Sequence, residues 1–316
     1  MMNTENNISK ANRKINSLPK HKASSTKKFN DSFWGYLMIF PTVAGLLIFY
    51  IYPFFKTFFY SFTNMGAFGE YAWTGIQNYK SLLTDTNLWL ALRNTLLYTI
   101  ISVPISIFLS ITVAALLNAK IKGLTVYRTL FFLPAVTMPA AVAMVWKWLY
   151  NSDYGLINYI LSKFSIKGPA WLSDPKIALY SIIVVSIWMT VGYNMVIFLA
   201  GIQGISKNYY EAAEIDGAGP IAQFFKITIP LLTPTIFFVS VMSLIGSFQV
   251  FDYIFMMIST NSVALESTQS VVYLFYKNAF MLQEKGYASA IAMVLFAVIM
   301  IITVIQIKLQ KRWVNY

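Results

Sequence analysis

Six uncharged, apolar stretches are the feature of this sequence that most limits what the chain can fold into. They cover residues 32–55, 94–119, 129–146, 177–206, 227–251 and 286–307. A transmembrane helix needs about 20 apolar residues to cross roughly 30 Å of hydrocarbon. Continuous runs of this length predict helices, because the strands of a membrane barrel would show alternating polarity. We therefore predict an all-α, multi-pass membrane protein with six transmembrane helices.

The distribution of positive charge predicts how these helices are oriented. The chain has 24 lysine and arginine residues against 12 acidic residues. Basic residues favour the cytoplasmic side of a membrane, and placing both termini there puts 15 of them inside and nine outside. Because this charge flanks the apolar runs, and forms no stripe among exposed aromatic residues, it does not indicate nucleic-acid binding.

The six predicted helices form one membrane domain over residues 32–308. Residues 1–31 are polar and without apolar periodicity, which predicts a disordered, basic cytoplasmic tail. Residues 309–316 form a short cytoplasmic tail at the other end. The chain has no cysteine, and its one histidine lies in the N-terminal tail. We therefore expect no metal site and no catalytic residue.

An acidic segment lies between the fourth and fifth predicted helices and reads YYEAAEIDGAGPIAQFFKITIPLL from residue 209 to residue 232. Residues 207–215 are suited to a short helix that Gly217 can end. Gly219 followed by Pro220 suits the start of a second helix. The orientation above puts the short helix at the cytoplasmic surface. Taken alone, it fits a solvated loop that merely joins two membrane helices.

The same segment resembles the EAA motif of ABC importer permeases, which reads Glu-Ala-Ala, three residues, Gly, nine residues, Ile, any residue, Leu, Pro. The matching residues are Glu211, Ala212, Ala213, Gly217, Ile227 and Pro230, with Ile229 in place of the leucine. The segment is similar to the carbohydrate branch of these permeases, which includes maltose-type, multiple-sugar-type and glycerol-phosphate-type systems. FPTVAGLLIFYIYPFFKTFFYSFTN and YRTLFFLPAVTMPAAVAMVWKWLYNSDYGLIN extend the resemblance. The outer loop ISTNSVALEST departs from it, since it lacks a glycine-rich TGGGP.

The resemblance implies the fold of a type I ABC importer permease in a bacterial cytoplasmic (inner) membrane. Its implied partners are a second permease subunit that completes a heterodimeric pore, two ATPase subunits or a homodimer of one, an extracytoplasmic sugar-binding protein, a carbohydrate and membrane lipid. ATP and magnesium would be held by the ATPase, so this chain would be no enzyme and bind no cofactor. Consistent with this, it has no GxxxxGK[ST] phosphate-binding loop.

The resemblance also assigns the segment 207–217 as the coupling helix that inserts into a groove of the ATPase. The residues that would couple the two proteins are Glu211, Ala212, Ala213, Asp216 and Gly217. A carboxylate such as that of Glu211 can form charge-assisted hydrogen bonds with the partner. Pro230 and Pro234 follow and are expected to interrupt the fifth membrane helix, because proline donates no backbone hydrogen bond.

Polar and aromatic residues of the fourth and fifth helices are candidates for the substrate path. A sugar is held by aromatic faces and by hydroxyl and amide groups, which in a membrane require a wet cavity. Many of the candidates recur every three or four positions and therefore share helix faces. They are Ser186, Thr190, Tyr193, Asn194, Ser243, Ser247, Phe248 and Gln249. The alternative is that they form polar contacts between helices.

The charged residues in and near the apolar runs distinguish the remaining alternatives for the function and the substrate. The six apolar runs contain no Asp or Glu, which speaks against an ion-coupled secondary transporter and an intramembrane enzyme. Asp252, directly after the fifth run, is either an ion site or an acid at the membrane edge that reaches water. The fourth and fifth runs contain no Lys or Arg that could bind a phosphate. A di- or oligosaccharide is therefore favoured over a glycerol-phosphate-type substrate.

Overall fold

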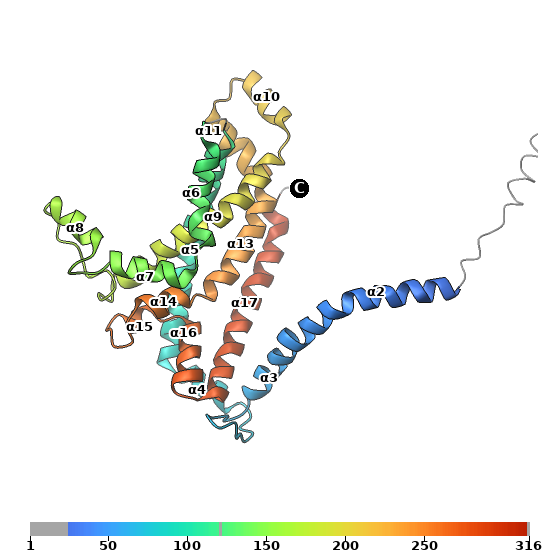
Figure 1. Cartoon of the computed structure of the whole chain (residues 1–316), viewed down its shortest axis with the longest axis vertical. Helices are drawn as coiled ribbons and strands as arrows, with labels where there is room; N and C mark the ends of the chain where they lie inside the picture. Colours follow the sequence, from blue (N-terminus) through green and yellow to red (C-terminus); the bar gives the residue numbers. More distant parts are fainter. Residues whose placement is uncertain (1–24, 120–121, 315–316) are drawn as a thin grey trace, which may run out of the picture. The chain divides into compact units, whose positions relative to one another are not determined.

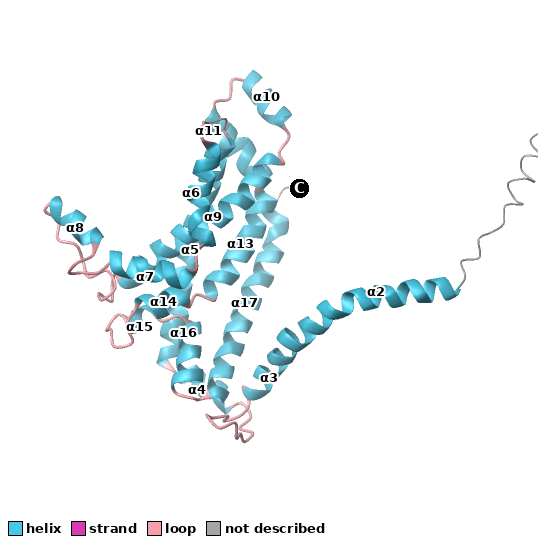
Figure 2. Cartoon of the chain, in the orientation of Figure 1, coloured by secondary structure: helices cyan, strands magenta, loops and turns pink. Residues whose placement is uncertain are grey.

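The computed structural model describes residues 25–119 and 122–314, and this part of the chain consists of helices and connecting loops (Figures 1 and 2). Within it there is no strand, and the one isolated β-bridge joins Thr63 and Trp73. Four described helices are long and apolar enough to cross a membrane, and the number becomes six if each of two bent helix pairs is one span. The predicted all-α class is confirmed, and the six predicted spans are recovered when the bent pairs are counted.

The chain divides into two compact units, and the first, residues 1–56, contains most of the first candidate span. Helix α2 (Ser25–Leu46) continues through the π-helical segment η1 (Leu47–Ile51) into α3 (Tyr52–Tyr60). Residues 25–31 were predicted to be disordered, but they are helical, since α2 begins at Ser25, before the first apolar run. Helical backbone hydrogen bonds can continue beyond the end of an apolar run. The rest of the predicted tail, residues 1–24, lies outside the described residues.

The second unit, residues 57–316, contains the other helices. They are α4 (Gln77–Thr84), α5 (Thr86–Asn118), α6 (Leu124–Val136), α7 (Pro139–Leu149), α8 (Leu156–Lys163), α9 (Ala178–Gln203), α10 (Lys207–Ile215), α11 (Pro220–Gln223), η2 (Phe224–Thr228), α12 (Ile229–Leu231), α13 (Thr233–Phe248), α14 (Asp252–Met257), α15 (Leu265–Thr268), α16 (Val271–Tyr276), η3 (Lys277–Met281) and α17 (Lys285–Trp313). The predicted C-terminal tail from residue 309 is helical as far as Trp313, since charged residues mark a membrane border without ending a helix.

Two apolar clusters hold α5, α9 and the segment around α13 together. One contains Ile182 of α9, and the other contains Phe198 of the same helix and Leu232. All three side chains are at most 2% exposed. Helix α5 packs along α9 and against α13, and α13 also packs against α17. The polar residues of α9 between positions 182 and 198 therefore lie between two closely packed layers.

A proline causes the bend in the third span. The axes of α6 and α7 differ by 98°, so the predicted helix over residues 129–146 is not straight. Pro139 begins α7, and Met138 before it has an extended backbone with ψ 125°. A residue that precedes proline is disfavoured in the helical region, because the proline ring contacts its backbone. The apolar run alone did not show this bend.

Two prolines cause the bend in the fifth span, as predicted. The segments Pro220–Leu231 and Thr233–Phe248 differ by 68° in direction. The π-helical segment η2 comes directly before α12, which contains Pro230. Pro234 cannot donate a hydrogen bond to the carbonyl of Pro230, and the Thr233 hydroxyl donates to it instead, over 2.8 Å. The interruption predicted at these prolines is confirmed.

Asn94 joins distant parts of the second unit, and its loss is expected to destabilise the fold. Its side-chain amide donates to the carbonyls of Glu266 (2.9 Å) and Gln269 (3.2 Å), and Asn94 is buried. Asn94→Ala leaves both carbonyls without this donor, at a cost of about 1–3 kcal/mol. We expect a lower melting temperature of the detergent-solubilised protein. The exposed Asn261, changed to Ala, is the control; equal melting temperatures for the two variants would contradict this role.

Candidate functional site

Helix α10 is built from short-range signals and ends where the sequence predicts. The Ser206 hydroxyl caps its start by accepting from the Asn208 N–H at 3.4 Å. At its end Gly217 has φ +80°, a conformation that glycine adopts at little cost. The Gly217 N–H donates to the Glu214 carbonyl (3.0 Å), and the Ala218 N–H donates to the Ala213 carbonyl (2.8 Å). These two bonds form a Schellman motif and stop the helix at this point.

The predicted coupling residues are brought together on an exposed surface. No residue of α10 is buried, and Glu211, Ala212, Asp216 and Gly217 are exposed while Ala213 is half-buried. The carboxylates of Glu211 and Asp216 have no ion-pair partner among the residues that the structure describes. The neighbouring Ile215 is 87% exposed, which is high for an apolar side chain. An exposed helix of this kind offers both carboxylates and apolar contacts to a partner protein.

Two hydrogen bonds connect this segment to the beginning of the fifth span. The Tyr210 hydroxyl lies 3.0 Å from the Thr228 hydroxyl, which belongs to η2. The Gln223 amide donates to the Ala218 carbonyl over 3.1 Å. Figure 1 shows α10 near α11, at the tip of the second unit that is uppermost in this view. A displacement of α10 would therefore be transmitted to η2 and to the helix that follows it.

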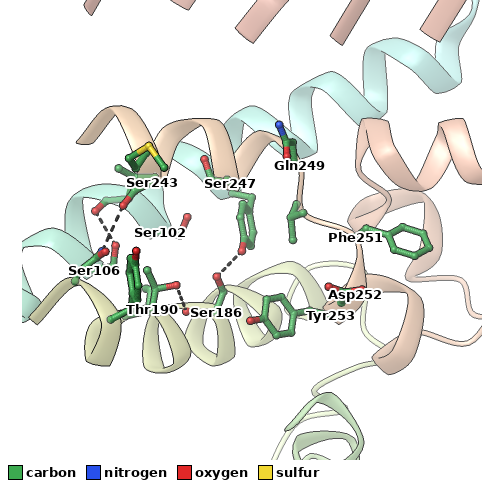
Figure 3. Close-up of a pocket in the computed structure, with 18 residues that line it drawn as sticks. Ser102, Ser106, Ser186, Thr190, Ser243, Ser247, Gln249, Phe251, Asp252 and Tyr253 are labelled. Atoms are coloured by element: carbon green, nitrogen blue, oxygen red, sulfur yellow. Dashed lines mark hydrogen bonds between the residues drawn. The ribbon is translucent and has the colours of Figure 1, made fainter. Parts of the chain in front are cut away.

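A cavity of about 350 Å³ lies among α5, α9, α13 and the start of α14 (Figure 3). Seven of the eight predicted substrate-path residues line it: Ser186, Thr190, Tyr193, Asn194, Ser243, Ser247 and Gln249. Phe248 does not. It is 2% exposed and packs in an apolar cluster with Leu88 and Leu274. Neighbouring residues of a helix point in directions about 100° apart, and here Ser247 faces the cavity while Phe248 faces the apolar cluster.

Most of the predicted polar residues already form hydrogen bonds between or within helices. This agrees with the alternative that they hold the helices together, and a hydroxyl that donates one bond can still accept another. The bonds join Tyr98 with Ser186, Thr190 with the Ser186 carbonyl (2.8 Å), Asn194 with Ser243 (3.3 Å) and Ser247 with Thr99 (3.0 Å).

Helix α5 contributes residues that the sequence prediction missed. Tyr98, Ser102 and Ser106 line the cavity and follow one another at intervals of four residues. This spacing places them on one face of a helix. The same regularity is visible in the second apolar run and could have identified them. Trp188 of α9, in contrast, lines a separate apolar cavity of about 740 Å³.

Asp252 and Tyr253 were also missed as cavity residues, because the apolar run ends just before them. Asp252 is exposed and is the only charged side chain among the described residues that line this cavity. Burial raises the pKa of Tyr253 to about 12, and the carboxylate of Asp252 adds to this shift. The Tyr253 phenol therefore stays protonated at neutral pH. Among the described residues no group of three or more His, Cys, Asp or Glu side chains could hold a metal ion.

Comparisons with known proteins agree with the motif and the fold. Residues 88–315 match the family described as binding-protein-dependent transport system inner membrane component. The chain is 36% identical to the probable ABC transporter permease protein YesP of Bacillus subtilis, over 93% of this chain and 95% of the relative. It is 37% identical to the multiple sugar-binding transport system permease protein MsmF of Streptococcus mutans, over 91% of this chain and 98% of the relative.

A glycerol-phosphate permease and a solved transporter are also similar. The sn-glycerol-3-phosphate transport system permease protein UgpA of Pectobacterium atrosepticum is 30% identical, over 93% of this chain and 99% of the relative. A chain of the bacterial alginate ABC transporter shares the fold, with a TM-score of 0.81 and 22% identity over 90% of this chain and 96% of that chain. The resemblance predicted from the EAA motif is confirmed. This multi-pass membrane protein belongs to the family of binding-protein-dependent transport system inner membrane components.

Proposed function

We propose that the chain is one permease subunit of an ATP-driven importer that moves a carbohydrate across the bacterial cytoplasmic membrane. The observation that carries this proposal is the continuous path from the exposed helix α10 to a polar cavity. Tyr210 connects α10 to η2, and the span that contains η2 continues to Ser243 and Ser247 at the cavity. A partner that moves α10 can thus change the walls of the cavity. The family and the names of the relatives support the same function.

The proposed complex needs partners for energy and for delivery of the substrate. The complex would contain two ATPase subunits, one of which would bind α10 on the cytoplasmic side, where both termini of this chain also lie. A second permease subunit would complete the pore, and an extracytoplasmic binding protein would deliver the sugar. ATP and magnesium would remain in the ATPase, so that this chain converts movement into a change of access without catalysing a reaction.

The bends of the fifth span suggest how movement of α10 reaches the cavity. Closure of the ATPase subunits would pull α10, and the Tyr210–Thr228 and Gln223–Ala218 bonds would pass this displacement to η2. Proline and π-helical segments are positions where a helix changes direction easily. The segment after the bend would then move against α9 and open the cavity toward the other side of the membrane.

A di- or oligosaccharide fits the cavity better than the glycerol-phosphate-type alternative. No lysine, arginine or histidine is among the described residues that line it, so a phosphate would find no opposite charge there. Hydroxyl, amide and aromatic groups are the chemistry that neutral sugars require. The 30% identity to UgpA keeps glycerol phosphate as the second candidate. The exposed Asp252 gives less support to an ion-coupled secondary transporter, because an ion site would be enclosed.

Uptake by the complete complex in proteoliposomes tests this proposal. Labelled disaccharides, trisaccharides and glycerol 3-phosphate would be offered with the binding protein outside, and with or without ATP inside. We expect uptake of a neutral sugar that requires both ATP and the binding protein, and little uptake of glycerol 3-phosphate. Uptake that continues without ATP and follows a proton or sodium gradient would overturn the importer function.

A further inference from the structure

The cavity contains polar groups that are free to bind a ligand, and they differ from most of the residues predicted from the sequence. The side chains of Ser102, Tyr193, Gln249, Asp252 and Tyr253 line the cavity. None of them has a hydrogen-bond partner among the residues that the structure describes. Four of these groups are neutral and can donate a hydrogen bond. The Asp252 carboxylate can only accept hydrogen bonds, and it carries the charge of the set.

The position of Asp252 makes its charge effective inside the cavity. Figure 3 shows Asp252 and Tyr253 toward one end and Ser106 and Ser243 toward the other. No described lysine or arginine lines the cavity to neutralise the carboxylate. Much of the remaining wall is apolar, including Val103, Ile187 and Met242. A charge in a cleft with low-dielectric walls acts more strongly on solutes than a charge on an open surface.

The chemistry of a carboxylate matches neutral sugars and opposes acidic ones. Neighbouring hydroxyl groups of a sugar ring can donate to the two oxygens of one carboxylate, and such charge-assisted bonds are stronger than neutral ones. A uronate or a sugar phosphate brings a second negative charge close to the first, and like charges repel each other. The same group would therefore attract one class of sugar and exclude another.

We propose that Asp252 determines the substrate class of this permease: it accepts hydrogen bonds from the hydroxyl groups of a neutral saccharide and excludes anionic saccharides from the cavity. This inference rests on the proposed function as a carbohydrate permease. It assigns Asp252 as a specificity-determining residue, which is neither of the roles that the sequence suggested for it. Tyr253 beside it supplies a neutral donor for the same ligand.

The charge of the cavity can be measured without knowing the sugar. The chain has no cysteine, so Gln249→Cys gives this subunit a single thiol in the cavity. The rates at which this thiol reacts with a cationic and an anionic methanethiosulfonate would be measured during ATP turnover of the full complex. The reaction would be followed by the mass that the reagent adds to this chain. The preference is the ratio of the cationic to the anionic reaction rate. We expect this ratio to be roughly tenfold or more higher at the cavity thiol than at an exposed thiol. Adding Asp252→Asn should remove most of that preference.

Asp153→Asn is the matched control, because Asp153 is an exposed acid that does not line this cavity. The preference should be unchanged in this variant. A preference that is equal with and without Asp252, or a thiol that reacts with neither reagent, would overturn the proposal. The second result would mean that charged solutes of this size never enter the cavity.

Uptake tests the recognition of the sugar. Asp252→Asn is expected to lower uptake of the neutral saccharide about tenfold or more, because a hydrogen bond to a charged group is lost, and Asp252→Glu should restore most of it. The variant should also reduce the discrimination between the neutral sugar and its uronate. If the wild-type complex shows no ATP-dependent sugar uptake, the proposed function fails. If the wild-type complex does show this uptake, and the Asp252→Asn variant equals it in uptake and in thiol preference, the proposed role of Asp252 fails while the proposed function stands.

Discussion

Replacing Gly217 with proline is expected to stop ATP-driven uptake while the complex remains folded. Gly217 has φ +80°, whereas proline holds φ near −65° and has no N–H. The variant also loses the bond from the Gly217 N–H to the Glu214 carbonyl. The local cost is about 3 kcal/mol or more. Because α10 is exposed, this cost changes the end of the helix and leaves the packed clusters intact. Uptake and binding-protein-stimulated ATPase activity in proteoliposomes measure the effect.

Gly219 provides a matched control for this prediction. Both glycines are exposed, and a Cβ added at either would meet no atom within 4 Å. They differ in backbone conformation, since Gly219 has φ −72°. Gly217→Ala should therefore cost roughly 1–2 kcal/mol, while Gly219→Ala should retain nearly normal uptake. Equal losses in the two alanine variants would contradict a special requirement for the turn at Gly217.

Charge reversal at Glu211 tests the partner surface separately from the turn. Glu211 is exposed, so Glu211→Lys should leave the fold unchanged. The new positive charge should repel the region of the ATPase that the Glu211 carboxylate would bind. We expect the assembled complex to lose stimulated ATP hydrolysis about tenfold or more, since truncating one partner of a buried charge pair costs about 2–5 kcal/mol. If both Glu211→Lys and Gly217→Pro transported normally, the segment would be a simple connecting loop.

The second large effect is expected at Gly192, where helices α6 and α9 are in backbone contact. A Cβ at position 192 would lie 2.2 Å from the Phe131 carbonyl oxygen and 3.2 Å from the Phe132 Cα. These are backbone atoms, so a side chain at 192 forces the two helices apart. Overpacking typically costs about 1–3 kcal/mol and occasionally more. We expect Gly192→Ala to lower the melting temperature, and Gly192→Leu to prevent folded protein from accumulating, as measured by size-exclusion chromatography in detergent.

Gly246 is the control for this packing effect. It lies within α13, and a Cβ added there would meet no atom within 4 Å. Alanine is a better helix former than glycine by about 1 kcal/mol, so Gly246→Ala should keep or raise the melting temperature. A Gly192→Ala variant as stable as Gly246→Ala would show that α6 and α9 can separate without cost.

The sequence by itself determined the features that depend on local chemistry. Apolar runs without charge located the membrane helices, because the hydrocarbon core excludes charged groups. Gly217 marked the end of α10, and Gly219 with Pro220 marked the start of α11. These signals act over a few residues, so they can be read without knowing what the segment contacts. Spacing within one helix likewise identified most of the polar residues that α9 and α13 present to the cavity.

Only the tertiary structure decided which groups the cavity leaves free. The Ser247 hydroxyl is bonded to Thr99, 148 positions away in the sequence, and no local pattern predicts that pairing. The orientation of Phe248 toward the core depends on the packing of α13 against its neighbours. The position of Asp252 in the cavity wall depends on α14 starting directly at the end of the fifth span. Contacts between distant segments therefore determine which groups face a ligand. They fix the rotation of each helix about its axis, and they occupy the hydrogen-bonding groups of some side chains while leaving others free.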